Sequence, residues 1–349
     1  MSEENIALYT KYRPQKFSEV LGQEQVTDVL TSALRLGNIS HAYLFSGSRG
    51  TGKTSVARIL ANEIGTSNND LYEIDAASNN GVDEIRRLNE AMRTLPFESK
   101  YKVYILDEVH MLSTPAFNAL LKTLEEPPKH VVFILATTEP QKIPETVVSR
   151  CEAYSFKPPN RAILANLAIT TAEKEGYKLE SSAAELIAIL GDSSFRDTHT
   201  TLQKLIRSST DRELSIEEVE KVTGAPQTNL VNNMIESIIL RKLEKGMSVI
   251  SILKEKNIDI KVFLKLLLEK IRTALLLKVA PNEKNLYQNF ISEDDIIFLQ
   301  KLIKENKSNL NLNSKVLLNL LKVYEESLKV PMPYLPLEIF LIDFSLEKG

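Results

Sequence analysis

Residues 42–63 read AYLFSGSRGTGKTSVARILANE, and this segment is the strongest indication of the fold. It begins with an apolar run typical of a buried β-strand and ends with apolar residues at helical spacing. The octapeptide between them fits the phosphate-loop pattern G-x-x-x-x-G-K-[ST]. Its residues are Gly47, Ser48, Arg49, Gly50, Thr51, Gly52, Lys53 and Thr54. We therefore predict a strand that ends at Ser46, an anion-binding loop, and a helix that begins near Lys53.

The residue types in this loop suit a nucleoside triphosphate with Mg²⁺. Three glycines let the backbone N–H groups approach an anion closely, and the helix N-terminus adds partial positive charge. Lys53 would contact the β- and γ-phosphates, and the Thr54 hydroxyl would bind Mg²⁺. The alternative is a glycine-rich turn that only caps a helix. The strand and helix on either side favour the nucleotide site.

A second run, VYILDEVH at residues 103–110, supplies an acidic partner. It places Asp107 at the carboxyl end of a buried strand, where the ligands of open parallel sheets bind. Asp107 would hold Mg²⁺, and Glu108 would act as the general base that polarises the attacking water. A strand that ends in Asp-Glu is commonly only solvated, but the phosphate loop upstream favours the catalytic interpretation. We expect His110 to be structural or to support the residues that contact the nucleotide, because a lone histidine has no metal partner.

The surrounding sequence predicts three domains. Apolar runs at 42–45, 71–74, 103–106 and 131–136 alternate with helical stretches at 55–63, 82–94 and 116–125, which indicates a doubly wound parallel α/β sheet within residues 1–158. Residues 159–225 show only helical patterns. Residues 226–349 have no glycine between Gly246 and Gly349 and predict a helical bundle, with Pro331, Pro333 and Pro336 in one linker.

Composition excludes several classes of protein. The chain has 349 residues, is 43% hydrophobic and carries a net charge of −3, so it is neither disordered nor uniformly basic. One cysteine, Cys151, permits no intrachain disulfide and no cysteine-rich zinc module, and we expect it to be a small buried residue. The N-terminus has no signal-peptide pattern and no run is long enough to span a membrane, so we expect a cytoplasmic protein.

Longer strings resemble the gamma/tau subunit family of the bacterial DNA polymerase III clamp loader. They are HMLSTPAFNALLKTLEEPP at 110–128, LATTEPQKIP at 135–144, SRC at 149–151, LYTKYRP at 8–14 and VLGQ at 20–23. The resemblance is dense over about residues 6–225 and implies an AAA+ ATPase, with 159–225 as a helical lid and 226–349 as a collar for oligomerisation.

The resemblance also implies roles that the residues do not establish by themselves. Thr137 matches a polar sensor of the γ-phosphate, and Arg196 matches a second sensor in the lid. Without the resemblance, Thr137 is an ordinary hydrogen-bonded residue and Arg196 a surface arginine. The residues that would border the adenine are Tyr12, Arg13, Pro14 and Val20.

Arg150 matches an arginine that reaches the ATP of the neighbouring subunit. A planar cation that binds two phosphate oxygens stabilises the charge on the transferred group. The alternative is a cation at a helix C-terminus, where the dipole contributes under about 1 kcal/mol.

The implied function is ATP-driven loading of a sliding clamp during DNA replication. The chain would hydrolyse ATP within the polymerase holoenzyme. It would join other clamp-loader subunits through the collar in a hetero- or homo-oligomeric ring. Its further partners would be the sliding clamp and primer–template DNA, and it would not bind a membrane. Two alternatives remain: an archaeal or eukaryotic clamp-loader small subunit, where Asn usually stands at the position of Thr137, and a non-hydrolysing stator subunit.

The sequence departs from the family in one segment. Gamma/tau subunits usually carry a four-cysteine zinc module between the phosphate-loop helix and the next strand, but residues 61–70 read ANEIGTSNND. We therefore expect no bound zinc. The chain ends at Gly349, and we also expect it to lack the long C-terminal extension that binds polymerase and helicase.

Overall fold

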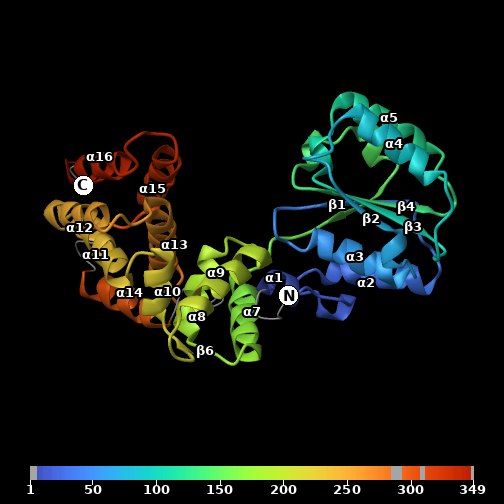
Figure 1. Ribbon diagram of the computed structural model, residues 1–349. Helices are drawn as coiled ribbons and strands as arrows, with labels where there is room; N and C mark the ends of the chain where they lie inside the picture. Colours follow the sequence, from blue (N-terminus) through green and yellow to red (C-terminus); the bar gives the residue numbers. More distant parts are fainter. Residues whose placement is uncertain (1–5, 284–292, 307–310, 347–349) are drawn as a thin grey trace. The chain divides into compact units, whose positions relative to one another are not determined.

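The structure, a computed structural model, describes residues 6–283, 293–306 and 311–346 (Figure 1). Two compact units emerge. The first comprises Met1–Ile163 with Ser193–Asp197, and the second comprises Leu164–Asp192 with Thr198–Gly349. The predicted three-part division at residues 158 and 225 stays a prediction.

The first unit is built on a parallel sheet of five strands in the order β2-β3-β4-β1-β5. The strands are β1 (Ala42–Ser46), β2 (Leu71–Asp75), β3 (Lys102–Asp107), β4 (Val131–Thr137) and β5 (Glu152–Ser155). The predicted α/β fold class is confirmed. Strand β5 was not predicted, because three of its four residues are exposed and it has no apolar run.

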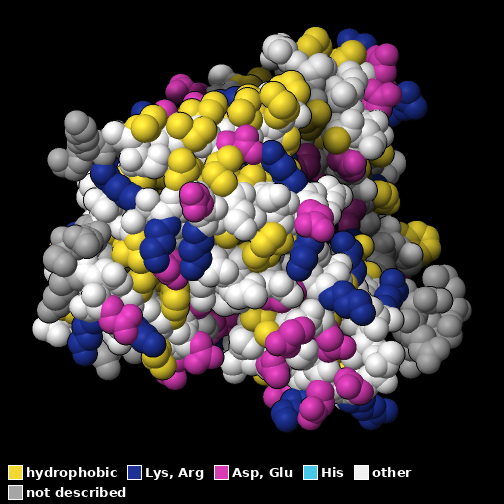
Figure 2. All heavy atoms as spheres, turned by 90° about the vertical axis from the view of Figure 1, so that its left-hand side faces the viewer, with side chains coloured by type: hydrophobic (Ala, Val, Ile, Leu, Met, Phe, Trp, Pro, Cys, Tyr) yellow, Lys and Arg dark blue, Asp and Glu magenta, His cyan; other side chains and the backbone are white. Residues whose placement is uncertain are grey.

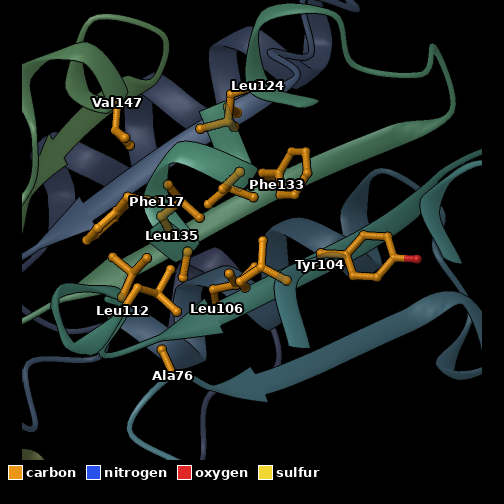
Figure 3. Packing of buried hydrophobic residues seen from close by; sticks show 14 of the residues in the cluster. Ala76, Tyr104, Leu106, Leu112, Phe117, Leu124, Phe133, Leu135 and Val147 are labelled. Atoms are coloured by element: carbon orange, nitrogen blue, oxygen red, sulfur yellow. The ribbon is translucent and has the colours of Figure 1, made fainter. Parts of the chain in front are cut away.

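Helices cover both faces of this sheet (Figure 1). Alternate residues of β3 point to opposite faces, so Tyr104 and Leu106 pack in one buried cluster and Val103 and Ile105 in the other. The first cluster includes residues of α4 (Val82–Met92) and α5 (Thr114–Glu125), as the packing of Phe117 and Leu124 on β3 and β4 illustrates (Figure 3). The second includes residues of α2 (Glu24–Arg35) and α3 (Lys53–Glu63). Because helices bury both faces of the sheet, the edge of the sheet where the loops meet is held in place.

Short helices complete the first unit. They are α1 (Leu8–Lys11), α6 (Glu145–Val148) and the 3₁₀ turns η2 (Phe17–Glu19), η3 (Asn68–Asp70), η4 (Val109–Met111) and η5 (Pro140–Lys142).

The second unit is mainly helical, as predicted. Its helices are α7 (Arg161–Lys174), α8 (Ser181–Leu190), α9 (Phe195–Ser208), α10 (Ile216–Thr223), α11 (Thr228–Ile239), α12 (Leu243–Glu255), α13 (Ile260–Val279), α14 (Glu293–Glu305), α15 (Ser314–Ser327) and α16 (Leu335–Leu346), of which α7 and α9 begin in the first unit.

Two details of this unit differ from the sequence prediction. The short strands β6 (Lys178–Leu179) and β7 (Glu213–Leu214) pair in parallel where only helices were expected. Pro336 lies in the first turn of α16 rather than in a linker, a position where a proline costs no helical hydrogen bond. No helix of the described residues is long and apolar enough to cross a membrane.

Candidate functional site

The phosphate loop connects β1 to α3, with the predicted boundaries at Ser46 and Lys53. Gly47, Gly50 and Gly52 have positive φ angles of 150°, 74° and 101°, which side chains rarely allow. Space is also limiting, because a Cβ on Gly47 would lie 2.6 Å from the Phe156 oxygen and one on Gly50 would lie 2.0 Å from Ser194 Oγ. The fold therefore requires glycine at these points in the loop.

Lys53 lies inside this loop, with only 6% of its surface exposed. Its Nζ donates hydrogen bonds to the carbonyl oxygens of Gly47 (2.7 Å) and Ser48 (2.9 Å). Burial lowers the pKa of Lys53, whereas the carboxylates of Glu108 and Asp107 raise it. The loop thus holds a buried amino group that can exchange carbonyl partners for phosphate oxygens.

Thr54 and Asp107 meet beside the loop. Thr54 Oγ1, in the first turn of α3, donates to Asp107 Oδ2 at the end of β3 over 2.9 Å. Hydroxyl and carboxylate oxygens are the ligands that Mg²⁺ prefers, so this donor set suits the ion.

Glu108 follows β3 with its backbone in the left-handed region, at φ 49° and ψ 44°. A non-glycine residue held there costs about 1–3 kcal/mol and marks a site that the surrounding structure enforces. Its Oε2 accepts hydrogen bonds from Thr138 Oγ1 (2.9 Å) and Thr138 N (3.3 Å). The carboxylate is thereby fixed near Lys53, whose pKa it raises more than Asp107 does.

Thr137 ends β4 beside the loop and is fully buried. Its carbonyl accepts from Gly47 N (3.2 Å), and its Oγ1 accepts from Glu139 N (3.0 Å) and lies 3.1 Å from His110 Nδ1. The same His110 nitrogen lies 3.4 Å from Glu108 Oε2, and its Nε2 lies 3.4 Å from Glu139 Oε1. His110 therefore lies between Thr137 and the carboxylates of Glu108 and Glu139.

Arg196 lies in the first turn of α9, within the first unit. Its guanidinium stacks over the Tyr9 ring at 5.5 Å, and its charge contributes to lowering the pKa of Lys53, which places it near the loop.

Two of the four residues predicted to border the adenine line one pocket. Arg13 and Pro14 line a pocket with Arg58, Ile59 and Asn62 of α3, whereas Tyr12 and Val20 are not among its lining residues. Val20 packs against the apolar cluster under the sheet instead. Contact of these residues with the adenine stays a prediction.

Arg150 lies just after α6 and makes contacts within its own chain. Its Nη2 pairs with Glu125 Oε1 at 2.6 Å, and its Nη1 donates to the Thr146 carbonyl at 2.6 Å. The neighbouring Cys151 is partly buried rather than fully buried as expected, and burial raises the pKa of its thiol to about 11.

Sequence reasoning missed three residues of the site. Gln23 is fully buried, and its Nε2 donates to the Lys157 carbonyl (2.7 Å) and the Thr51 carbonyl (3.4 Å), which ties the loop to the segment after β5. Thr138 contacts Glu108, and Tyr9 contacts Arg196. All three lie in the strings that resemble the family, but no local pattern gives them a chemical role.

The fold is that of the AAA+ class. In agreement, the solved structure of the RuvB Holliday junction branch migration motor of Thermotoga maritima covers 65% of this chain, and the match covers 79% of RuvB, at a TM-score of 0.53 and 20% identity. Residues 65–160 match the family model described as DNA polymerase III, delta subunit.

Curated relatives give the particular family. The chain is 40% identical to DNA polymerase III subunit tau of Bacillus subtilis over 79% of this chain and 52% of that protein. It is 34% identical to DNA polymerase III subunit gamma of Buchnera aphidicola over 79% of this chain and 80% of that protein. The chain belongs to the gamma/tau family of DNA polymerase III subunits, and it spans about half the length of curated relatives such as the Bacillus protein.

Proposed function

We propose that this chain is an ATP-hydrolysing subunit of a DNA sliding-clamp loader and that it acts in the cytoplasm. ATP binding would favour a state that opens the clamp, and primer–template DNA would trigger hydrolysis and release of the clamp. The observation that carries the proposal is the convergence of Lys53, Thr54, Asp107 and Glu108 at one edge of the sheet.

Each side chain has a separate task. The N–H groups of the loop and Lys53 bind the β- and γ-phosphates, and Arg196 approaches them from α9. Thr54 and Asp107 would hold Mg²⁺, which would neutralise charge on the phosphates. Glu108 takes a proton from the attacking water, and the Thr137 hydroxyl reports on the γ-phosphate.

An exposed apolar stripe on α15 and α16 supports assembly through the collar. Figure 2 shows the face of the helical unit that carries α16, with apolar side chains gathered along its upper part. The stripe consists of side chains that are 41–72% exposed: Leu318 and Leu321 of α15, Leu328 just after α15, and Ile339, Ile342 and Leu346 of α16. Exposed apolar area of this kind typically marks a protein–protein interface. The occupant proposed here is another clamp-loader subunit.

Two substitutions test the nucleotide site by affecting different steps. Lys53→Ala should weaken ATP binding about 10-fold or more, because a cation contact to phosphate is lost. Glu108→Gln should keep binding and lose about 10²-fold or more in turnover, because the shape is kept and the base is removed. The measurements are equilibrium ATP binding and ATP turnover of the chain assembled with its partner subunits, clamp and primed DNA.

The controls are Lys129→Ala and Glu63→Gln, the same changes at exposed positions, which should alter neither quantity. Turnover that survives Glu108→Gln at the wild-type rate would remove Glu108 as the base. A wild-type chain that binds the complex but contributes no Lys53-dependent turnover would instead be a stator subunit.

A further inference from the structure

The turn between α8 and α9 contains two consecutive residues in the left-handed region, Asp192 at φ 47° and Ser193 at φ 60°. The chain passes from the second unit to the first between them. Neither is a glycine, and both are exposed, so packing of their side chains does not compensate for the unfavourable backbone. Aspartate tolerates this region better than serine does. The backbone strain of this turn is therefore concentrated at Ser193.

The residues that follow Ser193 are fixed against the phosphate loop within the first unit. The Phe195 N–H donates to the Gly50 carbonyl over 3.0 Å. Ser194 is buried, and a Cβ on Gly50 would lie only 2.0 Å from its Oγ. The same Oγ accepts from Asp197 N at 3.1 Å, in the first turn of α9. Residues 193–197, which we call the docking segment, thus hold Arg196 beside the loop.

The residue that precedes Ser193 is fixed within the second unit. Lys265 Nζ, on α13, donates to Asp192 Oδ1 at 2.5 Å and to the Ile189 carbonyl at 3.0 Å. The lysine therefore satisfies a carbonyl at the end of α8 and pairs with Asp192. Within the residues that the structure describes, no hydrogen bond involves Ser193 itself. Since it has a fixed neighbour on each side, Ser193 must adopt the conformation that joins them.

The strain at Ser193 acts against the contact of the docking segment with Gly50. Ser193 can return to a favourable conformation when Phe195 leaves the Gly50 carbonyl, so release of the segment is favoured by the strain that is relieved. Gly50 belongs to the loop that binds the phosphates in the proposed function, and Arg196 lies on the segment that is released. Release would therefore remove Arg196 from the phosphates.

We propose that Ser193 is a release device for the nucleotide, and this inference rests on the proposed ATPase function. Its strain weakens the hold of the docking segment on the phosphate loop and thereby speeds the departure of ADP. Strain at one such residue changes the equilibrium between the held and the released segment by a factor of about 5 or more.

The first test changes the strain in both directions. Ser193→Gly removes it because glycine adopts a positive φ freely, whereas Ser193→Val increases it because a β-branched side chain disfavours this region. In the nucleotide-free protein, hydrogen exchange at the Phe195 amide should slow about 5-fold in the glycine variant and quicken about 5-fold in the valine variant.

The second test measures release of a fluorescent ADP analogue by stopped flow from the chain assembled with its partner subunits. Release should be about 5-fold slower in Ser193→Gly and faster in Ser193→Val. The matched controls are Asn257→Gly and Asn257→Val, at an exposed residue after α12 with φ 50°. They change strain of the same kind away from the loop and should alter neither the exchange of the Phe195 amide nor the release of the analogue.

Equal exchange of the Phe195 amide in the two Ser193 variants, or the opposite order, would overturn the release role, even where Lys53-dependent turnover of the wild type supports an ATPase. Altered exchange with unchanged release of the ADP analogue would also overturn it, because the strain would then not affect the nucleotide. A wild-type chain without Lys53-dependent turnover would overturn the proposed function itself, whatever the exchange of the Phe195 amide.

Discussion

At the scale of single residues, Asp70 joins two segments, residues 61–70 and the segment before β3, whose contact no sequence pattern predicts. Its carboxylate accepts hydrogen bonds from the backbone N–H groups of Phe97 (2.5 Å), Glu98 (3.0 Å) and Ser99 (2.9 Å). Asp70 ends the stretch 61–70, where the family resemblance implies a zinc module, and the three amides precede β3. A buried carboxylate thus makes a link between segments that needs no metal.

We predict that Asp70→Asn destabilises the first unit by about 1–3 kcal/mol at neutral pH, because one amide oxygen cannot satisfy three donors. Burial raises the pKa of Asp70, but the N–H groups of Glu98, Phe97 and Ser99 outweigh it and lower the pKa from 3.8 to about 2. Since the folded pKa is below the unfolded one, this stabilisation is present above about pH 4 and is lost as the pH falls toward 2. Urea unfolding of both proteins at pH 7 and pH 3 measures it.

The same experiment addresses the predicted absence of zinc. Treatment with a chelator should leave the unfolding midpoint of the wild type unchanged, and elemental analysis should find less than one zinc per chain. Equal stability of Asp70→Asn and wild type at pH 7 would contradict the structural role of the carboxylate. Stoichiometric zinc that survives the chelator would contradict the expectation of a zinc-free chain.

At the scale of elements, the three strands inside the sheet and the edge strand β2 were predictable from apolar runs, whereas the edge strand β5 was not. Strands β1, β3 and β4 lie inside a parallel sheet and are covered on both faces, so each is a continuous apolar run. Strand β5 lies at the edge of the sheet, and only Tyr154 of its four residues is buried. Its position follows from pairing with β1, which a local pattern does not encode.

The same distinction applies to the site. The phosphate loop and the Asp-Glu pair are local patterns whose chemistry can be read along the chain. The contacts of Thr138 with Glu108 and of Gln23 with Lys157 join residues 30 and 134 positions apart. They depend on strand order and register, so they became visible only in the folded protein.

The apolar stripe on α15 and α16 leads to a prediction at this scale. Ile339→Glu should leave the fold intact, because the side chain is 49% exposed, but it should weaken assembly with partner subunits by placing a charge in an apolar contact. Light scattering of the reconstituted complex measures assembly, and thermal unfolding checks the fold. Val279→Glu, the same kind of change at an exposed position outside the stripe, is the control. Normal assembly of Ile339→Glu would exclude this stripe as the interface.

At the scale of the whole molecule, the chain has a net charge of −3, so the proposed binding to DNA would require a local basic surface rather than overall attraction. The role proposed for Arg150 requires assembly, because it involves a neighbouring subunit. Its pair with Glu125 is half exposed, and such pairs contribute about 0–1 kcal/mol, so a phosphate of a neighbouring subunit can replace Glu125 at little cost.

We predict that Arg150 acts on the ATP of a neighbouring subunit. Arg150→Ala should leave the ATP affinity of its own site nearly unchanged, whereas turnover of the assembled complex should fall by as much as about 10³-fold, because the transferred phosphoryl group loses a cation. Arg207→Ala, at an exposed position in the last turn of α9, is the control. Mixing Arg150→Ala chains with Glu108→Gln chains should restore activity above the average of the two parents, because some interfaces then combine an intact Glu108 with an intact Arg150 from the other chain. Mixtures that stay at the average of their parents would confine Arg150 to a role within its own chain.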